Sequence, residues 1–176
     1  SGIFSRSSVL KRTRPVPPAT APPTRQRSRS RRTPLTPDTW WKKLNKTDVQ
    51  RPTAGNPVGA VRITRPRGIA IDPATFFRRE LFVNEQWRRR IDRSGNRIQV
   101  ANLVFDCYLE RRSLGIKHLR LDYGPHRAPG SRATTLLHWD DLADLVHSRN
   151  FEGWYLLIER GAGTMHRLTL TRTPPA

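Results

Sequence analysis

Cysteine is almost absent from this chain of 176 residues, and Cys107 is its only example. An intrachain disulfide is therefore excluded, and such sparing use of cysteine favours a reducing compartment. Because Cys107 lies in an alternating apolar run, we expect a buried thiol. Long apolar runs are also missing, since none approaches the ~20 residues of a membrane-spanning helix. Residues 1–37 lack the apolar block of a secretory signal, so we expect no membrane partner.

Acidic residues are scarce, and their distribution divides the chain in two. The whole sequence holds 33 Lys and Arg against 14 Asp and Glu, a formal net charge of +19. Residues 1–37 contain nine of these basic residues, seven prolines and no acidic residue, which predicts a flexible basic linker or arm. Residues 38–176 keep 24 basic against 14 acidic residues, a net charge of +10. A folded domain this basic predicts a polyanionic partner.

Patterns typical of catalysis and metal binding are missing as well. The five histidines form no cluster with zinc spacing, and no phosphate-cradling glycine motif occurs. The string HLRLD, which begins at His118, lacks the lysine that a phospholipase-D-type nuclease places two residues after its histidine. Asp106, Glu110 and Asp122 could form a carboxylate metal site, but ion pairing is the favoured interpretation in a basic protein. We therefore predict a binding protein rather than an enzyme, without cofactor or metal.

Short segments separated by turn signals dominate the chain from Trp40 onward. Alternating apolar residues predict strands over 61–65, 97–110, 117–123, 134–139, 154–160 and 166–172. Two short helices are predicted, one over 71–82 with Asp72 as N-cap and one over 140–150 with Asp140 and Asp141 in its first turn. Turns are predicted over 92–96 and 110–115, and a basic turn over 86–90. Six or seven strands without strand–helix alternation predict a mainly β barrel or sandwich. Its expected aromatic core comprises Trp40 or Trp41, Trp139, Trp154, Phe76, Phe77, Phe105 and Phe151.

Two polar loops interrupt this β pattern. The stretch KKLNKTDVQRPTAGNPVGAVRIT (42–64) begins like a buried strand, breaks into a polar run and resumes as a strand. A second loop, YGPHRAPGSRATT (123–135), again joins two predicted strands. Either loop alone could be a solvated connection, but two of them on one basic β domain predict a pair of arms that grip a duplex. Their side chains are of the types that read base edges and phosphates: Gln50, Arg51, Thr53, Asn56 and Arg62 in the first, and His126, Arg127, Ser131 and Arg132 in the second.

The order of these segments resembles the B-three DNA-binding domain of plant transcription factors and of restriction endonucleases. KKLNKTDV (42–49) is similar to the opening strand of that domain, and IDPATFFRRELF (71–82) occupies the place of its first helix. LRLDYGPHRAPGSRATTLLHWDDLADLV (119–146) and RNFEGWYLLIER (149–160) resemble its later strand, helix and glycine passages, although Trp154 replaces the usual acid. The spacing in TDVQRPTAGNPVGAVRIT (47–64) is closer still to the C-terminal recognition domains of phospholipase-D-type restriction endonucleases. The plant domains lack the insertion PTAGNPVG.

The resemblance implies a seven-stranded open pseudobarrel over residues 38–176, with two short α-helices and two loops in the major groove of duplex DNA. It implies that residues 1–37 link this domain to an N-terminal nuclease domain outside the chain. It implies a cytoplasmic location if the protein is a bacterial restriction enzyme, and a nuclear one if it is eukaryotic or viral. Carried over by position, the first arm holds Lys46, Asp48, Gln50, Arg51, Thr53 and Asn56, and the second holds His126, Arg127, Ser131 and Arg132.

Two other functions are compatible with the sequence. A viral coat-type protein could use residues 1–37 as an Arg-rich arm that packages nucleic acid, although the remainder is short for a coat jelly roll. An RNA-binding β barrel would instead prefer single strands or A-form helices.

Overall fold

The computed structural model describes residues 38–50, 59–63, 71–124 and 133–175, so the predicted linker over 1–37 lies outside it. Within these residues the fold is mainly β, as the sequence predicts. The strands are β1 (Thr39–Lys43), β2 (Ala60–Ile63), β3 (Arg88–Ile91), β4 (Arg97–Leu109), β5 (Arg112–Gly124), β6 (Thr134–His138), β7 (Tyr155–Glu159) and β8 (Met165–Thr171). The helical segments are α1 (Lys46–Val49), the π-helical turn η1 (Phe77–Leu81), the 3-10 turn η2 (Asp140–Leu142) and α2 (Ala143–Ser148).

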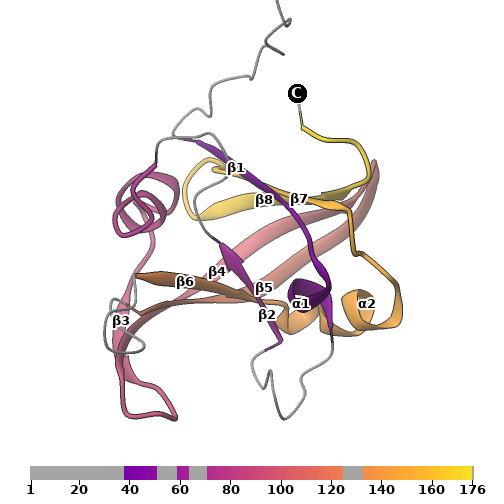
Figure 1. Cartoon of the computed structure of the whole chain (residues 1–176). Coiled ribbons are helices and arrows are strands. Elements are labelled where there is room, and N and C mark those ends of the chain that lie inside the picture. Colours follow the sequence, from indigo (N-terminus) through magenta and orange to yellow (C-terminus); the bar gives the residue numbers. More distant parts are fainter. Residues whose placement is uncertain (1–37, 51–58, 64–70, 125–132, 176) are drawn as a thin grey trace, which may run out of the picture. The chain divides into compact units, whose positions relative to one another are not determined.

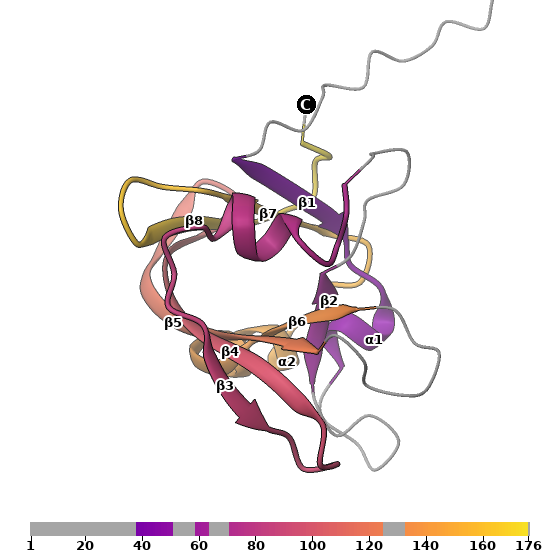
Figure 2. The ribbon, with the colours of Figure 1, turned by 90° about the vertical axis from the view of Figure 1, so that its left-hand side faces the viewer.

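All eight of these strands belong to one curled sheet. Seven of them follow one another in the order β1–β7–β8–β4–β5–β6–β2, and β3 pairs with β4 beside that path. The sheet curves into a nearly closed barrel whose two end strands are β1 and β2 (Figure 1, Figure 2). Neighbouring strands run antiparallel except β4 and β8, which run parallel. The expected barrel-like architecture is confirmed, with β3 as an additional strand.

The long hairpin of β4 and β5 forms the centre of the sheet. Side chains alternate across a strand, so the apolar residues of the two strands gather on one face. Leu103 pairs with Leu119, and Ala101 pairs with Leu121. These four side chains are at most 1% exposed, as the predicted alternation requires.

Several element boundaries differ from the predictions. The opening strand ends at Lys43, because Asn45 caps a helical turn over 46–49. The segment 71–82 begins with turns around Asp72 and continues as the π-helical turn η1, rather than as one α-helix. Asp72 nevertheless caps as predicted, since its carboxylate accepts from the backbone nitrogen of Ala74 at 3.0 Å. The predicted turn over 110–115 is shorter, because β5 already begins at Arg112.

One further segment differs in kind, and another has an additional role. The predicted basic turn over 86–90 contains the start of β3, which pairs Arg88 with Val100. Asp140 and Asp141 were expected to serve the helix that follows them. Both lie in the first turn of η2, as predicted, and their carboxylates also accept from the backbone nitrogens of Arg120 and His118, at 2.6 and 2.9 Å. They therefore satisfy donors on the edge of β5.

A single hydrophobic core fills the barrel. Trp40, rather than Trp41, is fully buried, and Trp154 packs against the core while remaining partly exposed. The other predicted aromatic core residues are buried, namely Phe76, Phe77, Phe105, Trp139 and Phe151. Segment η1 also covers one end of the core, where the guanidinium of Arg78 lies 3.9 Å from the centre of the Tyr123 ring. Trp87, which lies in the predicted basic turn over 86–90, is partly buried against the core.

Burial should make Cys107 unreactive in the folded protein. Its side chain is fully buried, and burial raises the pKa of the thiol from 9.0 to about 12. We expect Ellman's reagent at pH 8 to label Cys107 slowly in buffer and rapidly in urea. Because the native thiol keeps its proton where the unfolded thiol loses it, the free energy of unfolding should fall as the pH rises from 9.0 toward about 12. Equal labelling rates in buffer and urea would contradict this assignment.

Candidate nucleic-acid interface

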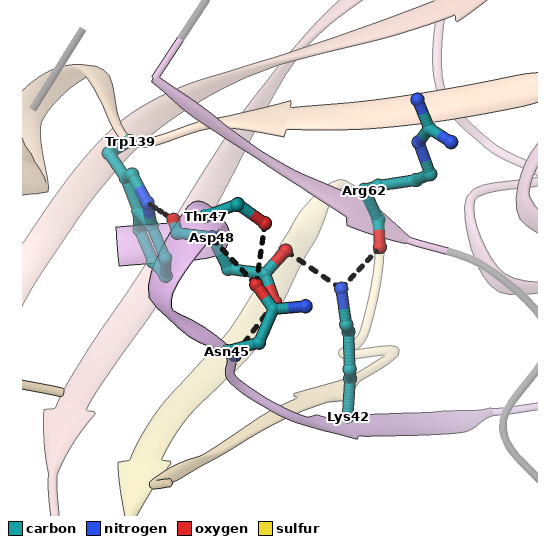
Figure 3. Close-up of polar contacts among 6 residues, drawn as sticks. All are labelled: Lys42, Asn45, Thr47, Asp48, Arg62 and Trp139. Carbon is teal, nitrogen blue, oxygen red and sulfur yellow. Dashed lines mark hydrogen bonds and ion pairs between the residues drawn. The ribbon is translucent and has the colours of Figure 1, made fainter. Parts of the chain in front are cut away.

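Lys42 bridges the gap between the two end strands of the sheet. Its ammonium donates to the carboxylate of Asp48 at 2.7 Å and to the backbone carbonyl of Arg62 at 3.0 Å. Lys42 lies on β1, Asp48 on α1 and Arg62 on β2, so one side chain joins three elements (Figure 3). We call this arrangement the Lys42 clamp. It closes the barrel where no ladder links β1 to β2 among the described residues.

Helix α1 depends on this clamp and on its own cap. A helix of four residues is too short to be stable alone. The Asn45 side chain accepts from the backbone nitrogen of Asp48 at 3.0 Å, and the Asp48 carboxylate accepts from the backbone nitrogen of Asn45 at 3.0 Å. This reciprocal pair is a capping box. Because Asp48 also binds Lys42, the same carboxylate fixes both the helix and its position on the barrel.

The part of the predicted first arm that lies outside the described residues, segment 51–58, is attached at the C-terminal end of β6. Before the segment, the indole nitrogen of Trp139 donates to the Asp48 carbonyl at 2.7 Å. After the segment, the chain enters β2 at Ala60, which pairs with His138. Both attachment points of the arm therefore lie beside the last residue of β6 and the tryptophan that follows it.

The predicted second arm, segment 125–132, is attached at the opposite end of the same strand. Gly124, the last residue of β5, pairs with Thr134, the first residue of β6. The five residues of β6 therefore separate the attachment points of the two predicted arms. Four residue steps in a strand span about 13 Å.

Four of the eleven predicted DNA-contacting residues belong to the part of the chain that the structure describes. Lys46 and Arg62 are exposed, Gln50 is half-buried, and Asp48 is 3% exposed. Figure 3 shows the Arg62 guanidinium directed away from Lys42, so this side chain remains available beside the first arm. The seven other residues lie outside the described residues: Arg51, Thr53, Asn56, His126, Arg127, Ser131 and Arg132.

Asp48 occupies a different position from the other three. Its carboxylate is buried and binds Lys42 and the Asn45 backbone nitrogen. A buried anion is also poorly suited to approach phosphates. We interpret Asp48 as a residue that positions the first arm, whereas its predicted contact with DNA stays a prediction.

One row of side chains crosses five strands on the side of the sheet opposite the core. Cross-strand partners lie on the same face of a sheet. A continuous row is therefore formed by the cross-strand pairs Arg88 with Val100, Val100 with Asp122, Asp122 with Leu136, and Leu136 with Arg62. We call this side of β3–β4–β5–β6–β2 the outer face. The adjacent row points into the core and contains Ala101, Leu121, Leu137 and Val61.

A buried polar cluster lies on the outer face. Asp122 and His138 are 8% and 7% exposed, and the Asp122 carboxylate lies 2.8 Å from Nε2 of His138. Arg120 contacts the same carboxylate through Nε at 3.2 Å and Nδ1 of His138 through Nη2 at 3.0 Å. The same Nη2 lies 3.3 Å from Nε2, so the guanidinium lies against both ring nitrogens of His138. The cluster thus holds Arg120 in a fixed position.

The other carboxylates considered for a metal site have separate partners. Asp106 accepts from the Tyr108 hydroxyl at 2.8 Å, and this hydrogen bond raises the pKa of Tyr108. Glu110 accepts from the Thr171 hydroxyl and the Arg172 backbone nitrogen, at 2.9 and 2.8 Å. The expected ion pairs are thus replaced by hydrogen bonds at Asp106 and Glu110, whereas Asp122 does form one. Within the described ranges, no group of three or more Cys, His, Asp and Glu could hold a metal ion.

Several exposed arginines of this region were not among the predicted site residues. Arg88, Arg89 and Arg90 lie on β3, and Arg93 follows in the turn to β4. The sequence does indicate a strand here, because RRRI (88–91) is followed by the turn signal DRSGN (92–96) and then by the alternating strand from residue 97, which is the pattern of a hairpin. A polar run before such a turn is readily taken for part of the turn itself.

No protein family model, curated protein or solved structure matches this chain. None of the helices formed by the described residues is long and apolar enough to cross a membrane.

The Lys42 clamp can be tested by substitution. Lys42→Ala would leave the Asp48 carboxylate buried without its cation, and we expect the free energy of unfolding to fall by about 2–3 kcal/mol. Lys46→Ala removes the same charge from an exposed position on α1, and we expect a change of no more than about 0.5 kcal/mol. Urea unfolding measures both variants. Equal losses in the two would show that the clamp does not stabilise the barrel.

Proposed function

We propose that residues 38–176 bind double-stranded DNA in a sequence-specific manner, with segments 51–58 and 125–132 in one major groove. The observation that carries this proposal is the attachment of both segments to the two ends of β6. Their attachment points are separated by about 13 Å, and the major groove of B-DNA is about 12 Å wide. Two arms attached at this spacing can enter the same groove.

The charge of the domain supports a polyanionic ligand. Residues 38–176 keep 24 basic against 14 acidic residues. Lys46 and Arg62 are exposed on the elements that flank the first arm. Phosphate contacts from such residues position a protein on a duplex, while contacts to base edges supply sequence preference. We assign the base contacts to the arms, where Arg51 and Arg132 suit guanine and Gln50 and Asn56 suit adenine.

A finer assignment rests on the resemblance to restriction endonucleases. In that assignment residues 38–176 are the target-recognition domain of such an enzyme, and a separate nuclease domain performs the cleavage. Residues 1–37 would link the two and attract phosphates without sequence preference. The chain itself acts as a binding protein in this proposal.

Substitution of one arginine in each arm tests the role of the arms. Selection from a random duplex library identifies the preferred site, and fluorescence anisotropy then measures the affinity of the full chain for it. Arg51→Ala or Arg132→Ala should each weaken binding by about 1–3 kcal/mol and relax the preference at one base pair. Arg112→Ala removes the same charge from an exposed position at the start of β5, and should leave the preference unchanged.

Salt and competitor dependence complete this test. If six to ten phosphates are neutralised, affinity should fall by roughly 10³- to 10⁵-fold between 50 and 200 mM salt. A uniform loss across all sequences would reduce Arg51 or Arg132 to a phosphate contact. Stronger competition by single strands or duplex RNA than by duplex DNA would contradict the proposal.

A further inference from the structure

The hairpin of β3 and β4 carries a dense positive charge. Residues 88–97 hold five arginines and one aspartate, a net charge of +4 over ten residues. All five guanidinium-bearing side chains are exposed. Among the residues that the structure describes, no ion pair joins any of the five to a carboxylate: Arg88, Arg89, Arg90, Arg93 and Arg97.

The one aspartate of the hairpin is engaged in shaping its turn. The Asp92 carboxylate accepts from the backbone nitrogens of Ser94 and Asn96, both at 2.9 Å, and from the Asn96 side chain at 3.2 Å. Gly95 adopts the left-handed conformation, with φ of +80°, that closes this turn. The turn therefore presents Arg93 from a backbone that is fixed before any ligand arrives.

A surface cavity of about 440 Å³ lies between this hairpin and the outer face. The polar residues that line it are Arg90, Asp92, Arg93 and Ser94 from the hairpin and Arg120, Asp122 and His138 from the neighbouring strands, and its apolar lining is Ile91, Ile98 and Val100. Asp122 is already engaged with Arg120 and His138 in the buried cluster. The contacts of Arg120 use Nε and Nη2, and no described residue accepts from its Nη1. The cavity therefore combines two exposed guanidinium groups with a third that is held in position.

We propose that this cavity binds a phosphate group, and that in the cell the group belongs to the backbone of the duplex held by the two arms. Guanidinium groups donate parallel hydrogen bonds that match the oxygens of a phosphate, and a fixed guanidinium loses little entropy on binding. The Ser94 hydroxyl adds a further donor at the rim. A neutral ligand would leave Arg90 and Arg93 without an ion-pair partner among the described residues, whereas Arg120 already pairs with Asp122.

The position of the cavity on the outer face connects it to the predicted arms. Arg88 and Arg62 are the two ends of the row that crosses the outer face, four strand spacings or about 19 Å apart. The first arm is followed in the chain by β2, which contains Arg62, and the second arm follows Gly124, the last residue of β5. That the cavity binds a phosphate group is inferred from its lining residues alone. That this phosphate belongs to duplex DNA rests on the proposed function.

A paired substitution separates this site from a general charge effect. The double substitution Arg90→Ala, Arg93→Ala should weaken binding of duplex DNA by the full chain about 5- to 20-fold. The number of neutralised phosphates, derived from the slope of log affinity against log salt concentration, should fall by about two. Arg111→Ala with Arg112→Ala removes the same charge from two exposed positions, one in the turn after β4 and one at the start of β5. We expect less than about a 2-fold change in that control, because only diffuse attraction is lost. Equal losses in the two double variants would overturn the inference.

A second measurement tests the cavity without DNA. Titration of the full chain with inorganic phosphate, followed by nuclear magnetic resonance of arginine Nε–H groups, should shift the signals of Arg90, Arg93 and Arg120. The Arg90→Ala, Arg93→Ala variant should lose the shift of Arg120, whereas Arg90→Lys with Arg93→Lys should retain part of it. Shifts that are uniform over all exposed arginines would overturn the phosphate site.

The two measurements also distinguish this inference from the proposed function. If Arg51→Ala relaxes the preference at one base pair while the Arg90→Ala, Arg93→Ala variant binds duplex like the unmodified chain, the arms function and the cavity inference fails. If the chain binds no duplex but phosphate shifts the cavity arginines specifically, the proposed function fails and the phosphate site stands. An unchanged urea midpoint in each variant excludes unfolding as the cause of lost binding.

Discussion

The end strands of the barrel have to be held together without a shared β ladder, and the Lys42 clamp meets this constraint. β1 pairs only with β7 and β2 only with β6 among the described strands, so each has one edge without a ladder. The ammonium of Lys42 spans that gap through Asp48 and the Arg62 carbonyl. Because Asp48 also caps α1, the position of the four-residue helix, and with it the attachment of segment 51–58, depends on the same ion pair.

The two faces of the sheet divide the remaining tasks. The inner rows supply the core through Leu121, Leu137 and Val61, which are fully buried. The outer face instead carries Arg62, Arg88 and the cluster around Asp122. Strand β6 serves both faces, because Leu137 points into the barrel and His138 belongs to the outer cluster. A short strand can therefore join the core to the surface that we propose for DNA.

The alternation of apolar and polar residues was sufficient to predict the strands and buried side chains whose position depends on local sequence. The strands predicted over 97–110 and 117–123 and the buried Cys107 follow from side-chain periodicity. The cap interaction of Asp72 follows from its residue type and its position before Pro73. The strand β3 was missed, because three consecutive arginines have no apolar face and are placed only by pairing with β4. The clamp joins Lys42 to Asp48 and Arg62, 6 and 20 positions away. In the cluster, His138 lies 16 positions from Asp122 and 18 from Arg120. Tertiary structure, rather than any local pattern, brings these residues together. Most predicted arm residues lie outside the described ranges, so those contacts stay predictions.

Segments 51–58 and 125–132 are both attached to β6, one at each end of the strand. The attachment points of the first segment are Asp48 and Ala60, and those of the second are Gly124 and Thr134. All four residues belong to helices or strands of the fold. We expect substitutions or insertions within segments 51–58 and 125–132 to leave the register of β6 and the packing of Leu137 unchanged. If the domain binds DNA as we propose, an exchange of these two short segments would change its target preference and leave the scaffold unchanged.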